Sequence, residues 1–233
     1  MQMIRFANAL CLLAVTTSLI AASDQIDSKR APQDASADTN PNSDFWRGVP
    51  AIFAERDTAG NPVAAHRTEI RSRWTATNLY FLFICPYEQL NLKPDPKTEI
   101  ETNLLWKWDV AEAFIGSDFQ HIRKYKEFEI SPQSEWVDLD IDLDAPLPEG
   151  GWKWNSGFQT SARIDKSSNT WYAFMRIPYA SVDPRPAAAG NTLRINLFRA
   201  QGTPPNRKLI AWQTPHRPSF HVPEVFGTLK LTD

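Results

Sequence analysis

Cysteine is scarce in this sequence. Cys11 and Cys85 are the two cysteines among its 233 residues, and Cys11 falls in an N-terminal segment that we expect to be removed. A single remaining cysteine excludes an intramolecular disulfide, although the expected destination of the chain is oxidising. Because Cys85 lies in the apolar run 79–85, we expect it to be a small buried core residue rather than a nucleophile.

Long hydrophobic runs are also missing. The N-terminal apolar run, residues 9–22, is shorter than the roughly 20 residues that a membrane-spanning helix needs. Arg5 precedes this run, and residues 21–23 follow it with the small side chains that a signal peptidase requires. We therefore predict a signal peptide over residues 1–23 and export to the periplasm or the extracellular space, with no membrane association after its removal. A retained N-terminal anchor is the alternative interpretation.

Positive charge is not concentrated anywhere along the chain. Lys and Arg number 25 against 27 Asp and Glu, which gives a net charge of −2. Without a basic stripe the protein offers little to a phosphate backbone, so we expect no nucleic-acid partner. The sequence also lacks the Gly-x-Ser-x-Gly, His-Glu-x-x-His and Cys-x-x-Cys motifs, which argues against the hydrolase, metalloprotease and thiol redox chemistry that these motifs support.

What the sequence does contain is the two-residue periodicity of β-strands. Residues 137–144 alternate apolar and acidic side chains, which in a strand places the apolar residues on one face and the carboxylates on the other. Residues 171–177 and 193–198 also carry an apolar residue at every second position, whereas 79–85 is apolar on both faces, as in a central strand. The 18 prolines and several turn sequences separate such runs. We therefore predict an all-β fold, an antiparallel, jelly-roll-like β-sandwich.

The segment between the signal peptide and these strands has a different composition. Residues 24–44 are rich in Asp, Ser, Ala, Asn and Pro and carry little that is large enough to bury. Such a segment cannot offset the entropy cost of ordering, so we predict a flexible linker here. The folded domain is expected to span residues 45–233, which is long enough to form a core without a disulfide. We expect it to be a monomer.

Tryptophan is abundant, with nine residues in the chain. Proteins read sugars with flat aromatic rings against the apolar ring faces and with planar polar groups along the hydroxyl edges. The segment 104–115 offers both, since Trp106 and Trp108 occur beside Asp109 and Glu112 at the expected entrance to a strand. Four other tryptophans fall within strand patterns and are expected in the core: Trp46, Trp74, Trp171 and Trp212.

The spacing within this segment resembles that of a known family. Trp106-x-x-Asp109-x-x-Glu112-x-Phe114 is similar to the W-x-x-D-x-x-E-x-F signature of family 9 carbohydrate-binding modules. Each further element of the resemblance is weak alone, but together they follow the order of the family across residues 45–231. These elements are Trp46, Arg71-x-x-Trp74 with Asn78-Leu79-Tyr80, Tyr172 with Ile177-Pro178, and the closing run from Pro223 to Leu229.

The resemblance implies a β-sandwich that binds plant-type polysaccharides or oligosaccharides, such as xylan and cellulose, and supports hydrolases outside the cytoplasm. In the family a sugar end lies between two aromatic rings, and these positions correspond to Trp106 and Phe220. A polar contact of the family corresponds to Glu112. Asp109 belongs to the same signature, and Trp108 shares a face with Trp106 if the strand has already begun, so both are further candidates for carbohydrate binding.

Three family positions carry a different residue type in this sequence. Phe220 stands where a second tryptophan is expected, Glu129 where an arginine is expected, and Phe198 where a glutamine is expected. Other side chains of the late strands and loops could supply polar groups to the sugar in place of the arginine and the glutamine. The candidates for this replacement are Asn196, Arg199 and His221.

The sequence marks no catalytic pair. A glycoside hydrolase needs two carboxylates across a cleft, about 5 to 9.5 Å apart, and the signature accounts for Asp109 and Glu112 without catalysis. We therefore predict that the protein is not an enzyme. The sequence identifies no cofactor with certainty. Family members often hold structural Ca²⁺, but the alternating carboxylates of residues 137–144 lack the tight loop that cages this ion. The sequence leaves such a calcium site unplaced.

Two alternatives remain open. Exported haem-binding sandwiches have a similar outline, and Met175 with His121, His216 or His221 could serve as axial ligands. Against this, Met175 falls on the apolar face of a regular strand, where a core methionine is expected. The second alternative is an interaction domain that has kept the sandwich and lost sugar binding.

Overall fold

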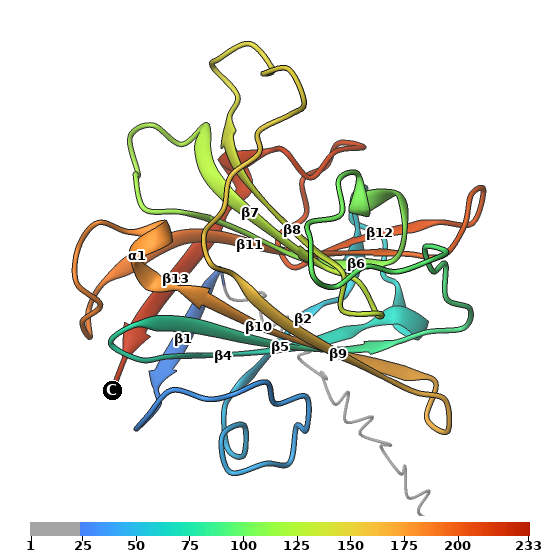
Figure 1. Cartoon of the computed structure of the whole chain (residues 1–233), viewed down its shortest axis with the longest axis horizontal. Helices are drawn as coiled ribbons and strands as arrows, with labels where there is room; N and C mark the ends of the chain where they lie inside the picture. Colours follow the sequence, from blue (N-terminus) through green and yellow to red (C-terminus); the bar gives the residue numbers. More distant parts are fainter. Residues whose placement is uncertain (1–23) are drawn as a thin grey trace, which may run out of the picture.

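The structure, a computed structural model, describes residues 24–233, so the predicted signal peptide lies outside the described residues. The described chain forms thirteen strands in one continuous hydrogen-bonded sheet that folds over into two packed layers (Figure 1). The strands are β1 (Gln25–Arg30), β2 (Ala51–Ala54), β3 (Arg56–Asp57), β4 (Thr68–Trp74), β5 (Asn78–Pro86), β6 (Val110–Gly116), β7 (Lys124–Ile130), β8 (Trp136–Asp142), β9 (Gln159–Asp165), β10 (Thr170–Pro178), β11 (Thr192–Gln201), β12 (Lys208–Ala211) and β13 (Gly227–Thr232).

Helical structure within residues 24–233 is limited to single turns. They are η1 (Ala64–His66), η2 (Leu105–Lys107), η3 (Pro223–Val225) and the four-residue α1 (Tyr179–Val182). No helix in the described part of the chain is long and apolar enough to cross a membrane. The all-β expectation is therefore confirmed.

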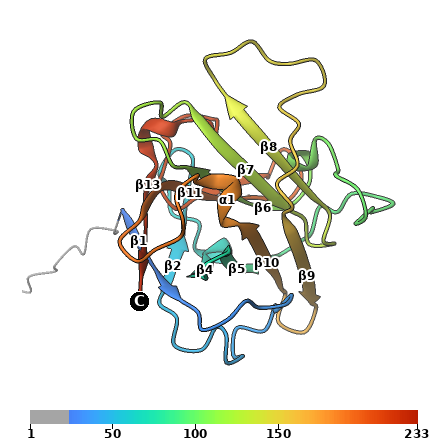
Figure 2. The same cartoon turned by 60° about the vertical axis from the view of Figure 1, so that its left-hand side comes forward.

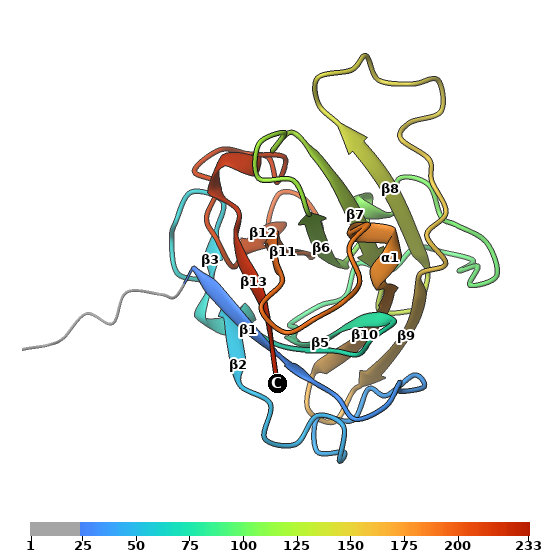
Figure 3. The same ribbon diagram turned by 90° about the vertical axis from the view of Figure 1, so that its left-hand side faces the viewer.

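The strand order explains how one sheet makes two layers. β8, β7, β6 and β11 lie side by side in one layer, and β4, β5, β10 and β9 lie side by side in the other. β13 and β1 connect the two layers at one edge, and Figure 3 shows the layers curving around the core between them. Nearly all pairings are antiparallel, as predicted, but β1 runs parallel to both β13 and β4.

The prediction of a flexible linker over residues 24–44 is wrong for β1. Ile26 and Ser28 are buried, and the Ser28 hydroxyl lies 2.8 Å from that of Ser72 on β4. In Figure 2, β1 lies along β13 at the edge of the molecule. A polar strand is held here because its backbone groups pair with β13 and β4, a source of order that composition does not reveal.

The main core lies between the two layers and contains the tryptophans expected there. Trp74, Trp171 and Trp212 are buried in it, and Trp46 is buried in a smaller cluster beneath the segment that precedes β2. Cys85 is buried in the main core, where burial raises the pKa of its thiol to about 12. The expectation of an inert core cysteine is therefore confirmed.

A second apolar cluster covers the other face of the layer formed by β6, β7, β8 and β11. Alternation along each strand sends one set of side chains to the main core and the other set to this second face. On β8, Leu139 and Ile141 belong to the second cluster, while Asp140 and Asp142 pair with Lys126 and Lys124. The candidate site lies on this second face.

Candidate functional site

A pocket of about 530 Å³ opens on the second face of the layer. This volume is within the range of roughly 300 to 1,000 Å³ that is typical of small-molecule sites. Its lining is mostly apolar and aromatic, with two carboxylates from neighbouring strands. The lining residues that the argument uses are Trp106, Glu112, Glu127, Trp152, Phe220 and His221.

Trp106 is placed at the pocket by a short, well-anchored turn. Leu104 adopts a left-handed conformation (φ of 63°) immediately before η2, and the buried side chain of Leu105 holds the turn to the second cluster. The Arg207 guanidinium donates hydrogen bonds to the backbone carbonyls of Trp106, Lys107 and Trp108. Trp106 itself remains 39% exposed. Its backbone is therefore held in place while its indole ring stays accessible to a ligand.

Phe220 and His221 reach the pocket from the loop before η3. The Phe220 ring stacks on Phe198 of β11, with 4.2 Å between centroids and 17° between planes. His221 Nδ1 lies 2.7 Å from the Tyr125 hydroxyl, and its ring packs 5.3 Å from that of Phe114. Burial lowers the pKa of His221. Both side chains are therefore fixed before any ligand arrives.

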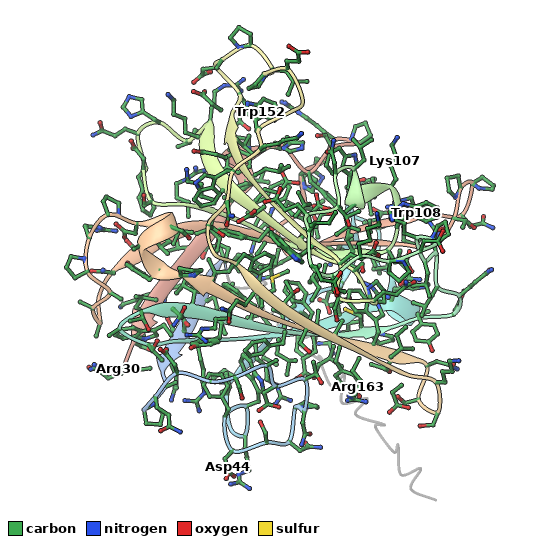
Figure 4. The ribbon with its side chains drawn as sticks, viewed as in Figure 1. Arg30, Asp44, Lys107, Trp108, Trp152 and Arg163 are labelled. Carbon is green, nitrogen blue, oxygen red and sulfur yellow. The ribbon has the colours of Figure 1, made fainter. Side chains whose placement is uncertain are left out.

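Trp152 belongs to the pocket, although the sequence motifs did not select it. It lies on the long loop between β8 and β9, near the top of Figure 4. Gly150 and Gly151, both with positive φ, precede it, and its indole Nε1 is buried without a hydrogen-bond partner. The sequence signal that could have identified Trp152 is its position directly after a Gly-Gly turn, which places a tryptophan on a loop.

Three buried glutamates occupy the strands beneath this pocket. Glu112 on β6 lies directly opposite Glu129 on β7, and Glu127 is two residues from Glu129 on the same face. An oxygen of each carboxylate lies within 4.8 Å of an oxygen of the other two. Each side chain is at most 3% exposed.

Burial is the largest influence on all three glutamates. It raises the pKa of Glu127 to about 7, and together with the neighbouring carboxylates it raises the pKa of Glu112 and of Glu129 well above the usual range. Both oxygens of Glu129 and one of Glu127 are buried without a hydrogen-bond donor. Arg207 is the nearby cation, but its hydrogen bonds go to backbone carbonyls. Apart from the contact between Glu127 and Glu129, the three carboxyl groups therefore have no side-chain partner, and none forms an ion pair with a described residue.

The structure brings together four of the eight predicted binding residues. Trp106, Glu112, Phe220 and His221 all line the pocket. Trp108, at the right of Figure 4, ends the same turn as Trp106 but does not line the pocket.

Three further residues predicted to bind sugar have structural roles instead. Asp109 accepts hydrogen bonds from the backbone N–H groups of Asn91 and Gly202, and so ties the entrance of β6 to two loops. Asn196 exchanges hydrogen bonds with the backbone of Gln213. Arg199 faces the main core, because it follows Phe198 by one residue and so points to the opposite side of β11. None of these three side chains lines the pocket.

The residues of the haem alternative lie apart. Met175 is buried in the main core, whereas His221 lines the pocket on the other face of the opposite layer. His121 is exposed, and its Nδ1 lies 2.7 Å from Oδ2 of Asp118. His216 is exposed beside Gly60. In the described part of the chain, the pocket thus contains one of the four residues proposed as axial ligands.

The family assignment follows from sequence comparison over most of the chain. A family model described as "Carbohydrate family 9 binding domain-like" matches residues 38–233. The chain belongs to this family. The turn η2 with Trp106 and the strand with Glu112, which carry the resemblance noted in the sequence, form one side and the floor of the pocket.

Solved structures of family 9 modules share this fold. Two structures of a module from Caldicellulosiruptor kristjanssonii, one with glucose and one with cellotriose, both match with a TM-score of 0.66, at 14% and 13% identity. Both cover 89% of this chain, and 95% and 93% of the solved chains. A structure from Bacteroides uniformis matches with a TM-score of 0.69 at 13% identity, over 89% of this chain and 98% of its own. At such identities the likeness shows the fold alone.

A curated relative gives a further match. A protein of Arthroderma benhamiae described as an extracellular protein is 27% identical over 146 residues. The match spans 57% of this chain and 64% of the relative. The chain thus covers less than two thirds of that protein.

Proposed function

We propose that this protein binds carbohydrate in the pocket between Trp106 and Phe220. The observation that carries the proposal is a preformed pocket in which exposed aromatic faces stand above buried carboxylates at the family's own motif positions. The Trp106 ring offers a flat surface to the C–H face of a sugar. Glu112 and Glu127 offer acceptors to the hydroxyl groups along the sugar's edge.

The proposed ligands are plant-type poly- or oligosaccharides related to cellulose or xylan. The solved relatives from Caldicellulosiruptor kristjanssonii contain glucose and cellotriose, which supports a β-glucan as the first ligand to try. The pocket differs from the family pattern at Phe220, Glu129 and Phe198. Because these differences replace hydrogen-bond donors by an acid and an apolar ring, we expect a preference different from that of a family member with the full set.

The protein is proposed to act outside the cytoplasm, as a non-catalytic partner of hydrolases. The predicted signal peptide and the relative described as extracellular support this location. The carboxylates of the pocket lie side by side on adjacent strands, whereas the two carboxylates of a glycosidase flank the scissile bond from opposite sides. We therefore propose binding without hydrolysis, by a monomer.

Calorimetric titration with cello- and xylo-oligosaccharides tests this function. We expect binding by the wild-type protein and a loss of about tenfold or more in Trp106→Ala, because each aromatic–sugar contact contributes on the order of 1–2 kcal/mol. Trp108→Ala is the matched control, since Trp108 is on the same loop and does not line the pocket. The same incubations should release no reducing sugar.

Two results would contradict the proposal. If a well-folded protein gives no heat with any sugar, the interaction-domain alternative gains support. If Trp106→Ala and Trp108→Ala bind sugar equally well, the binding surface lies elsewhere.

A further inference from the structure

We propose that Glu112, Glu127 and Glu129 bind one hard divalent cation, with Ca²⁺ as the first candidate, at the floor of the pocket. The first argument is geometric. One oxygen from each carboxylate lies within 4.8 Å of the others, so small side-chain rotations are enough for a single ion among them to contact all three at ordinary metal–oxygen distances of about 2.3–2.6 Å. β6 and β7 fix this spacing, because Glu112 and Glu129 are partners in the sheet register.

The second argument is the missing partner. Apart from a carboxyl–carboxyl contact between Glu127 and Glu129, both oxygens of Glu129 and one oxygen of Glu127 are buried without a hydrogen-bond partner. A buried carboxylate without a donor or a counterion is strongly destabilising. Like charges directly opposite on adjacent strands add to this cost. A positively charged ligand bound between Glu112, Glu127 and Glu129 would explain why three carboxyl groups are buried together.

The third argument concerns the type of ligand. The donor set consists of carboxylate oxygens alone, which suits Ca²⁺, Mg²⁺ or Mn²⁺ rather than metals that prefer sulfur or imidazole. An ammonium group in the pocket could reach Glu112 and Glu127, which line it, but Glu129 is not among the lining residues. A small ion between the side chains of β6 and β7 accounts for all three glutamates.

The acidic side chains of β8 that pair with lysine provide the contrast. Asp140 and Asp142 are paired with Lys126 and Lys124, and Asp144 beyond the strand is paired with Arg123. These carboxylates already have counterions in the protein and are partly exposed. The structure therefore points to the three buried glutamates, rather than to Asp140, Asp142 and Asp144, as the cation site.

The position of the site gives it a second role, which rests on the proposed carbohydrate function. Glu112 and Glu127 face the pocket, and three carboxylates leave coordination positions of a hard cation unfilled, since Ca²⁺ takes six to eight oxygen ligands. Neighbouring hydroxyl groups of a sugar in the pocket would fill these positions. Carbohydrate affinity should therefore rise when the cation is present.

Cation binding can be measured directly by titrating chelator-treated protein with CaCl₂, MgCl₂ or MnCl₂, and by following the thermal unfolding midpoint. We expect one ion per chain and a higher midpoint with the cation. Glu129→Gln should weaken binding by about tenfold or more, because it removes one of three charged ligands. The chelated variant should also unfold at a higher temperature than the chelated wild type, since a buried like charge is gone. Asp140→Asn, an exposed carboxylate on β8, is the control.

The outcomes separate the two proposals. No cation binding at millimolar concentrations, or equal binding by wild type and Glu129→Gln, would overturn the cation site. If the cation site fails this test but the protein still binds sugar in the presence of chelator, the proposed function stands. Glu127→Gln should repeat the loss, which guards against a folding defect in one variant. Cello-oligosaccharide binding that is equal in chelator and in Ca²⁺ would overturn the role of the cation in holding sugar.

Discussion

At the scale of single residues, Arg207 connects the aromatic side of the pocket with its acidic floor. Its guanidinium donates to three consecutive carbonyls of the turn that presents Trp106. It is also the cation that acts on Glu112 and Glu129 through space. A planar group with several fixed donors can hold such a turn, whereas an ammonium group cannot reach three carbonyls with the same geometry.

Arg207→Lys should therefore weaken carbohydrate binding more than it weakens the fold. We expect a loss of about three- to tenfold in affinity, because Trp106 would no longer be fixed in position. The thermal midpoint should fall by only a few degrees, since Arg207 is outside the main core. Titration with a cello-oligosaccharide and a thermal unfolding curve measure the two effects. Lys208→Ala, which removes an exposed charge from the adjacent position, serves as the control, and equal affinities in both variants would contradict this role.

At the scale of elements, β1 completes the sheet between the two layers. It pairs with β13 over five register positions and with β4 at its end. Asp34, just beyond it, accepts hydrogen bonds from four side chains in the turn before β5 and at its start: Thr75, Thr77, Asn78 and Tyr80. Burial would raise the pKa of Asp34, but these hydrogen bonds outweigh it and hold the pKa well below the usual range. The N-terminal segment is thus part of the domain.

A chain that begins at residue 45 should be much less stable than one that begins at residue 24. Removal of residues 24–44 leaves β13 and β4 with unpaired edges and uncovers Trp46 and Tyr80. We expect a loss of more than about 4 kcal/mol, or roughly 10 °C or more in the unfolding midpoint, and a tendency to aggregate. Thermal unfolding followed by circular dichroism compares the two chains. Equal midpoints would support the prediction of a linker instead.

Strand periodicity predicted several of these elements but not the pairing between them. β8, β10 and β11 follow from alternation, and β5 from its two apolar faces, because these signals lie within each strand. β1 has two buried side chains, Ile26 and Ser28, and its order comes from backbone pairing with strands that are distant in sequence. Such pairing leaves almost no local signal.

The site was partly accessible to the same reasoning. The family signature leads to Trp106 and Glu112, whereas the prediction of Arg199 as a sugar contact neglects strand parity, which sends it to the opposite face from Phe198. Glu127 was missed because its meeting with Glu112 depends on the register of β6 and β7. Strand register depends on turns and packing, so the grouping of Glu112, Glu127 and Glu129 could not be predicted from the sequence.

At the scale of the whole molecule, buried acids stand on both faces of the layer that contains β8. Beside the pocket are the three glutamates, and on the opposite side of β8 the buried Asp138 meets Glu101. One oxygen of Asp138 accepts hydrogen bonds from the backbone N–H and the hydroxyl of Ser156, while the other has no donor. Glu101 is the neighbour that can donate to it when protonated, and its raised pKa favours that form.

This pair predicts that stability falls as the pH rises through the range in which Glu101 ionises. Burial first, and then the hydrogen bond to Asp138, raise the pKa of Glu101 from 4.5 to about 7, against a smaller opposing effect of Lys153. The folded state thus holds the proton more tightly than the unfolded state, so the stabilisation is full below about pH 4.5 and is lost as the pH passes about 7. Glu101→Gln keeps a donor for Asp138 that does not ionise, and should make this decline in the thermal midpoint less steep. Glu127, whose pKa is also raised to about 7, keeps its own share of the decline. Glu149→Gln, on an exposed loop, should keep the wild-type slope, and an equally steep decline in Glu101→Gln would show that the proton is held elsewhere.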